Sequence, residues 1–119
     1  MNAARYDGTA RRARIVATAR SWLGTPYHHQ ASLRGVGCDC LGLVRGVWRE
    51  LYGDEPEPLP PYDPYWAQHA ADETLALAAM RHLAAIEPAQ AFPGDILLFR
   101  WRDHWPAAHC AILTEPGRI

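Results

Sequence analysis

Apolar residues recur at helical spacing in the first half of the chain and at strand spacing only near its C-terminal end. Residues 9–23 and 39–52 each carry an apolar stripe with the period of a helix. Residues 96–99, extended by Trp101, form an apolar run typical of a buried strand, and residues 108–114 alternate as a second strand. Helices followed by strands predict an α+β fold rather than a doubly wound sheet.

The element boundaries follow from glycine and proline. Gly24 is placed to end the first helix, and Gly53 to end the second. Residues 25–37 are expected to form a loop. Five prolines lie within residues 56–64, which predicts a stiff extended strap on the surface. A third helix is expected over residues 66–86, and its anchors are Leu75, Leu83 and Ile86.

Size and composition limit the functional class. A chain of 119 residues is expected to be one domain, and a net charge of −1 gives no field for nucleic acid. The longest apolar runs are too short to span a bilayer, and the polar N-terminus resembles no secretory signal. Three cysteines cannot all pair with each other, so at least one thiol is free.

The sharpest motif is Gly37-Cys38-Asp39-Cys40-Leu41-Gly42 at the start of the second helix. Asp39 is a natural N-cap, which puts Cys40 in the first turn, where unpaired N–H groups and the helix dipole favour a thiolate. Such a thiolate is the nucleophile of cysteine hydrolases. The alternative is that Cys40 is a buried core residue, although the flanking glycines indicate close approach of another backbone.

A cysteine nucleophile needs a base, and six histidines are available. His109 lies in an apolar strand, where an imidazole needs either a task or a polar partner. His28 and His29 precede the Cys40 helix and are candidates to line a cleft. Zinc is the competing chemistry, but Cys38 and Cys40 have C-x-C spacing with no second pair downstream.

Four ordered blocks together resemble the NlpC / p-sixty family of bacterial cell-wall cysteine peptidases, and they extend the resemblance over about residues 10–119. The blocks are Trp22-Leu23-Gly24-Thr25-Pro26-Tyr27, Asp39-Cys40-Leu41-Gly42-Leu43-Val44, Pro93-Gly94-Asp95-Ile96-Leu97-Leu98-Phe99 and His109-Cys110-Ala111-Ile112-Leu113. The proline-rich strap is similar to that of the branch carried on phage tails and gene-transfer particles.

The resemblance implies a papain-like α+β domain over residues 1–119, in which the nucleophile helix packs on an antiparallel sheet. It implies that Cys40 is the nucleophile and His109 the general base. It further implies that Tyr27 lines the substrate cleft and that Asp39 helps to bind the amine of a stem peptide. No cofactor and no metal is implied.

Two features depart from the family pattern. Leu41 stands where the family usually has serine, and the residue that orients the imidazole is expected just beyond Ile119. We therefore expect the domain to be truncated at its C-terminus; the alternative is that a partner adds the missing strand.

The function implied is hydrolysis of peptide bonds in peptidoglycan stem peptides, at the tail tip of a virion or phage-like particle made in the bacterial cytoplasm. The implied partners are hub proteins of the tail tip or baseplate, with no nucleic-acid contact and no membrane segment. Two alternatives stay open. One is a structural tail-tip module without catalysis, and the other is an amidase or acyltransferase on the same fold.

Overall fold

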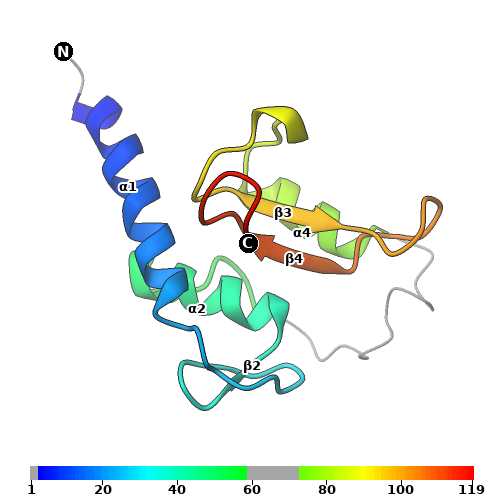
Figure 1. Cartoon of the computed structure of the whole chain (residues 1–119). Coiled ribbons are helices and arrows are strands. Elements are labelled where there is room, and N and C mark those ends of the chain that lie inside the picture. Colours follow the sequence, from blue (N-terminus) through cyan, green and yellow to red (C-terminus); the bar gives the residue numbers. More distant parts are fainter. Residues whose placement is uncertain (1–2, 59–72) are drawn as a thin grey trace.

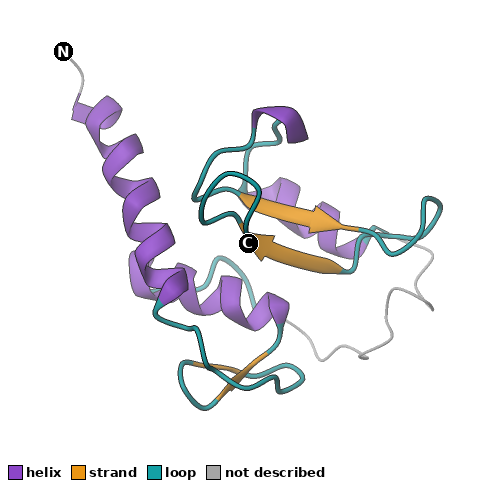
Figure 2. Cartoon of the chain, viewed as in Figure 1, coloured by secondary structure: helices purple, strands orange, loops and turns teal. Residues whose placement is uncertain are grey.

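The computed structural model describes residues 3–58 and 73–119, and three α-helices precede the larger sheet in it, as predicted (Figures 1 and 2). A further short pair of strands, which the sequence did not predict, lies between the first two helices. The elements in chain order are α1 (Ala3–Arg20), β1 (Ser32–Leu33), β2 (Gly37–Cys38), α2 (Cys40–Tyr52), α4 (Thr74–His82), the 3-10 helix η1 (Pro88–Gln90), β3 (Ile96–Phe99) and β4 (His109–Ile112). The described residues thus form a small α+β fold with three α-helices and two small antiparallel sheets. No helix among them is both long enough and apolar enough to cross a membrane.

Each sheet is a single antiparallel pair of strands. β1 pairs with β2 inside the segment that the sequence predicts as a loop. In the larger sheet, Ile96 lies opposite Ile112 and Phe99 opposite His109. Because side chains alternate along a strand, this register puts Cys110 and Ile112 on one face and His109 on the other.

The core joins α1, α2 and the larger sheet. Ala19 from α1, Trp22 just after it, Val47 from α2 and Ile112 from β4 form its buried centre. Gly46 lets Trp22 lie directly on α2, since a Cβ at this position would be 2.1 Å from the indole ring. This packing holds the N-terminal end of α2 beside β4, and Figure 1 shows the two elements adjacent.

Helix boundaries differ from the predictions. α1 begins at Ala3, ahead of the predicted start near residue 9. α1 ends at Arg20, so Leu23 leaves the predicted apolar stripe and is 81% exposed; Gly24, with φ +87°, follows the helix as predicted. α4 ends at His82 because Leu83 adopts an extended backbone. Leu83 and Ile86 are therefore exposed rather than anchoring a helix, whereas Leu75 is buried as predicted. Residues 66–72 of that predicted helix, and residues 59–64 of the strap, lie outside the described residues.

The predicted strand is confirmed over residues 96–99, but the prediction that it is buried and extended by Trp101 is wrong. β3 ends at Phe99. Leu98 and Phe99 are exposed because, among the described residues, β3 pairs with one strand only, β4, in a two-stranded sheet. Trp101 lies in the following loop. The turn at residues 93–95 and the tight turn at 116–118 are present, the first with Gly94 at φ +98° and the second closed by an antiparallel bridge between Glu115 and Arg118.

Candidate active site

Asp39 fixes the start of α2 and the loop in front of it. Its Oδ1 accepts the Gly42 N–H at 2.7 Å, which is the predicted N-cap bond. Its Oδ2 accepts the Gln30 N–H at 2.8 Å and lies 3.9 Å from Nδ1 of His29. One buried carboxylate therefore holds both the loop and the first helical turn, and it places Cys40 at the first position of α2.

Two glycines allow this loop to lie against the helix, as the sequence indicates. A Cβ at Gly42 would be 1.9 Å from the carbonyl oxygen of Ala31, and a Cβ at Gly37 would be 2.9 Å from Cβ of His28. The Ser32 hydroxyl donates to the Gly42 carbonyl at 2.6 Å and closes the same contact. The glycines around the two cysteines thus serve backbone packing of the site.

Cys40 meets two neighbouring residues of β4. The Cys110 thiol, the Cys110 backbone N–H and the His109 imidazole are placed to act on the Cys40 sulfur as hydrogen-bond donors. The thiol of Cys110 has the largest effect, and with the other two bonds and the positive charge of the imidazolium it outweighs burial. These groups lower the pKa of the Cys40 thiol from 9.0 to about 6.

The other two thiols respond in the opposite direction. The hydrogen bond to Cys40 and burial both raise the pKa of Cys110, whose residue is 3% exposed. Burial, followed by the negative charges of Asp39 and Cys40, raises the pKa of Cys38. At neutral pH, Cys40 is therefore the thiolate among the three cysteines.

Aromatic rings hold the imidazole of His109. Trp101 stacks on it with ring centroids 5.7 Å apart, and Phe99 packs against it at 5.8 Å with an interplanar angle of 37°. Trp101 comes from the loop after β3, which Glu73 anchors by accepting hydrogen bonds from Arg100 and from the Ala107 N–H. The orientation of His109 thus depends on residues far from Cys40 in sequence.

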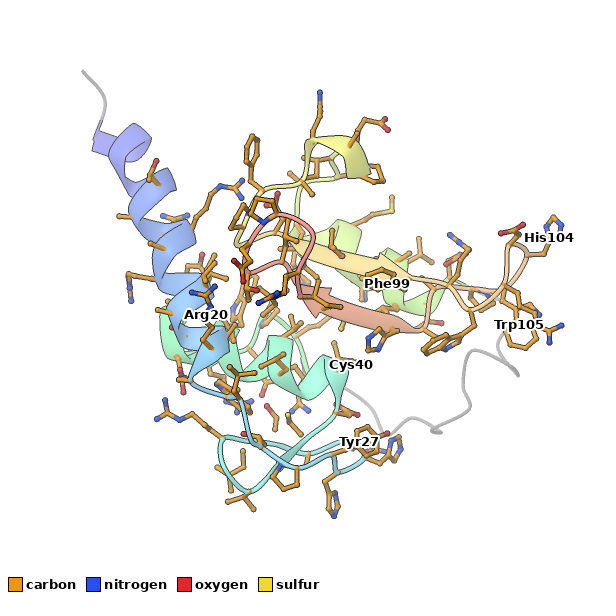
Figure 3. The ribbon with its side chains drawn as sticks, in the orientation of Figure 1. Arg20, Tyr27, Cys40, Phe99, His104 and Trp105 are labelled. Atoms are coloured by element: carbon orange, nitrogen blue, oxygen red, sulfur yellow. The ribbon has the colours of Figure 1, made fainter. Side chains whose placement is uncertain are left out.

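A cleft of about 810 Å³ runs past these groups. Cys40, His109 and Cys110 line it, together with Tyr27, His29 and Trp101. Its lining also includes Arg20, Glu115 and Arg118, where Glu115 lies 3.3 Å from Arg118 and 3.9 Å from Arg20. Figure 3 shows Cys40 projecting from α2 toward β4, with Tyr27 on the neighbouring loop.

The structure brings all four predicted site residues to one place. Cys40, His109, Tyr27 and Asp39 line the same cleft. Tyr27 is 72% exposed, and its backbone bridges to Cys38, so its ring is open to a ligand. Both carboxylate oxygens of Asp39 already accept backbone hydrogen bonds, which ties its role first to the shape of the site.

The histidines differ in their position relative to the cleft. His29 lines the cleft, whereas His28 is exposed outside its lining. His104 lies at the far end of the β3–β4 connection, away from Cys40 (Figure 3). His82, at the end of α4, packs edge-on against Trp48 and lies 3.2 Å from Glu57.

Sequence reasoning missed Cys110 and Trp101 as site residues. Cys110 follows His109, but strand alternation predicts opposite faces for the two side chains. Both residues nevertheless act on Cys40, because the start of α2 lies at the edge of β4, toward which the Cys110 N–H also points. Trp101 reads as a continuation of the strand, and no local signal shows that its ring returns to His109.

The metal alternative concerns residues 3–58 and 73–119. No group of three or more His, Cys, Asp or Glu side chains in these ranges is arranged to hold a metal ion. Comparison of the chain with protein-family models, with curated proteins and with solved structures finds no match. The chemistry of the cleft itself therefore carries the functional argument.

Proposed function

We propose that this chain is a cysteine peptidase that cleaves peptide bonds in peptidoglycan stem peptides. The observation that carries the proposal is the contact of the Cys40 sulfur, at the first position of α2, with the His109 imidazole on β4. Thiolate and imidazolium side by side in an open cleft form the ground state that nucleophilic acyl transfer requires. The resemblance of the four sequence blocks to cell-wall cysteine peptidases supplies the substrate class.

The first half of the reaction forms an acyl-enzyme. The Cys40 sulfur attacks the scissile carbonyl carbon, and a C–S bond forms as the carbonyl π electrons move to oxygen. The N–H groups of Cys40 and Leu41 have no acceptor within α2, so they are the candidate donors to this oxyanion. His109 gives its proton to the leaving amine as the C–N bond breaks.

The second half regenerates the enzyme. His109 takes a proton from water, whose oxygen attacks the thioester carbon. The C–S bond then breaks, the carboxylic acid product leaves, and the thiolate–imidazolium pair returns. Tyr27 and Trp101, both exposed and both lining the cleft, offer ring surfaces to a bound peptide.

The test is digestion of purified peptidoglycan, with products identified by mass spectrometry. Cys40→Ala is expected to lower the rate at least about a thousandfold, because the nucleophile is lost. Cys38→Ala is the matched control and is expected to retain activity, since Cys38 has no role in the acyl transfer. Survival of wall digestion in Cys40→Ala would overturn the mechanism.

A structural module without catalysis is the second candidate. It is favoured by the surroundings of His109, which Phe99 and Trp101 hold through ring contacts. Such a module is expected to cleave neither a panel of stem peptides nor amide and thioester substrates. The same panel separates peptidase from amidase or acyltransferase activity, because the acyl acceptor differs.

The proposed setting is the tail tip of a virion or phage-like particle, where local cleavage opens the wall for DNA delivery. This setting rests on the resemblance of the proline-rich strap and on the partners that the resemblance implies, which are tail-tip or baseplate hub proteins. Immunogold labelling of purified particles with an antibody to this chain tests it, and label along the tail shaft or on the head would contradict it.

A further inference from the structure

We propose that Cys40 and Cys110 form a reversible dithiol–disulfide pair, closed by peroxide and reopened by a dithiol. The inference concerns thiol chemistry and goes beyond the proposed peptidase activity. It starts from a contact between two sulfurs on different elements. Cys40 begins α2 and Cys110 lies in β4, and these two elements pack against each other. Both cysteines line the same cleft, where the Cys110 thiol is placed to donate to the Cys40 sulfur.

The two thiols differ in access to solvent. Cys40 is half-buried and lines the open cleft, where a small oxidant reaches it. Cys110 also borders the cleft but is only 3% exposed. An oxidant in solution therefore meets Cys40 first, and Cys110 is positioned to react with whatever forms on the Cys40 sulfur. This division matches that between a peroxide-reactive thiol and a resolving thiol.

Cys38 is the competing partner, and backbone geometry disfavours it. Asp39 between the two cysteines is extended, with φ −102° and ψ −174°. Across one extended residue the Cα atoms of Cys38 and Cys40 are about 6.5–7 Å apart, at the far end of the disulfide range. A disulfide between Cys38 and Cys40 would also distort the backbone of Asp39, which forms the N-cap of α2.

The chemistry needs one oxidant and releases water. The Cys40 thiolate attacks a peroxide oxygen, the O–O bond breaks, and Cys40 becomes a sulfenic acid while the peroxide is reduced to hydroxide or alkoxide. The Cys110 sulfur then attacks the Cys40 sulfur, and the thiol proton leaves with the hydroxyl group as water. The two sulfurs together have lost two electrons to the peroxide. An external dithiol returns these electrons by thiol–disulfide exchange, which restores both thiols.

The disulfide would remove the nucleophile while protecting it. A sulfenic acid without a nearby thiol is open to further oxidation to the irreversible sulfinic acid. Closure onto Cys110 stops that path and links the start of α2 to β4. Peroxide would thus switch the site off without destroying it.

The experiment uses the full chain, reduced and then exposed to hydrogen peroxide. Remaining thiols are alkylated in denaturant, and the intact mass and tryptic peptides are measured. We expect loss of two alkylation sites and a link between the peptides of residues 35–45 and 103–118, with Cys38 still alkylated. Dithiothreitol is expected to restore both sites.

Variants separate the possible outcomes. Cys38→Ser is expected to form the same link, whereas Cys110→Ser is expected to form none and to accumulate sulfinic acid at Cys40. A link between Cys38 and Cys40, or sulfinic acid at Cys40 in the unmodified chain, would overturn the proposal. Because each readout is the state of a thiol, it stands or falls separately from peptidase activity.

Discussion

At the scale of single residues, the chemistry depends on which groups reach the Cys40 sulfur. The start of a helix favours a thiolate, but the larger effects here come from β4, through Cys110 and His109. Asp39, adjacent in sequence, contributes by holding the helix start and the loop in place. The reactive state of Cys40 is thus a property of the α2–β4 contact rather than of the motif alone.

This difference predicts the pH dependence of Cys40 alkylation. Since the Cys40 pKa is lowered to about 6, the rate with iodoacetamide is expected to rise with pH, reach half its maximum near pH 6 and level off above pH 7. His109→Ala removes a hydrogen bond and a positive charge, so it is expected to move the midpoint upward. The measurement is made in a Cys38→Ser background, which leaves Cys40 as the accessible thiol. A midpoint near 9, or one unchanged by His109→Ala, would contradict the assignment.

At the scale of elements, α2 is positioned by close contact with Trp22. Gly46 removes the side chain that would otherwise separate the helix from the indole ring. The same helix presents Val47 to the core and Cys40 to the cleft. Packing on one side of α2 and chemistry at its N-terminus are therefore coupled.

Gly46→Ala tests this packing against helix propensity. Alanine normally stabilises a helix interior relative to glycine by about 0.5–1 kcal/mol. Here the new Cβ would be 2.1 Å from the Trp22 ring, so we expect a net loss of about 1–3 kcal/mol in the free energy of unfolding. Gly8→Ala in α1, where a Cβ meets nothing within 4 Å, is the matched control and is expected to stabilise. Urea unfolding measures the free energy of unfolding of both variants. An increase for Gly46→Ala would contradict the close packing of Trp22 on α2.

At the scale of the whole molecule, arginines join segments that lie far apart in the sequence. Arg12 of α1 donates to Asp95 at 2.8 Å, which ties the first helix to the turn before β3. Glu55 accepts from Arg45 and Arg49, and Arg49 also donates to the Ser32 carbonyl. This second cluster links α2, the loop before it and the segment after it around one carboxylate.

The ion pairs of Glu55 with Arg45 and Arg49 predict that part of the free energy of unfolding depends on pH. Hydrogen bonds from Arg45 lower the pKa of Glu55, so its contribution is present above the ordinary value of 4.5 and is lost as pH falls through the lowered value. Glu55→Gln is expected to cost up to about 1 kcal/mol at pH 7 and less at pH 3. Urea unfolding at both values measures it, with Glu87→Gln, at an exposed carboxyl outside the cluster, as control. An equal loss at both values would show that charge is not the cause.

The first two helices, the two C-terminal strands and the first half of the site were predictable because local signals determine them, whereas the pair β1–β2 was not predicted. Apolar periodicity located α1 and α2, Asp39 identified the start of α2, and Gly24 and Gly94 have the positive φ that their turns require. These features depend on backbone preferences within a few residues. Cys40 and His109 could be named as candidates for the same reason, from a helix start and a polar residue in an apolar strand.

The sequence by itself thus determined the first two helices, the two C-terminal strands, the cap at Asp39 and the candidate cysteine. Only the tertiary structure decided which groups set the reactivity of that cysteine. Cys110 and Trp101 join the site because the edge of β4 meets α2 and because a loop returns to His109. Contacts between residues distant in sequence depend on packing of whole elements, and no local pattern of side chains encodes that packing.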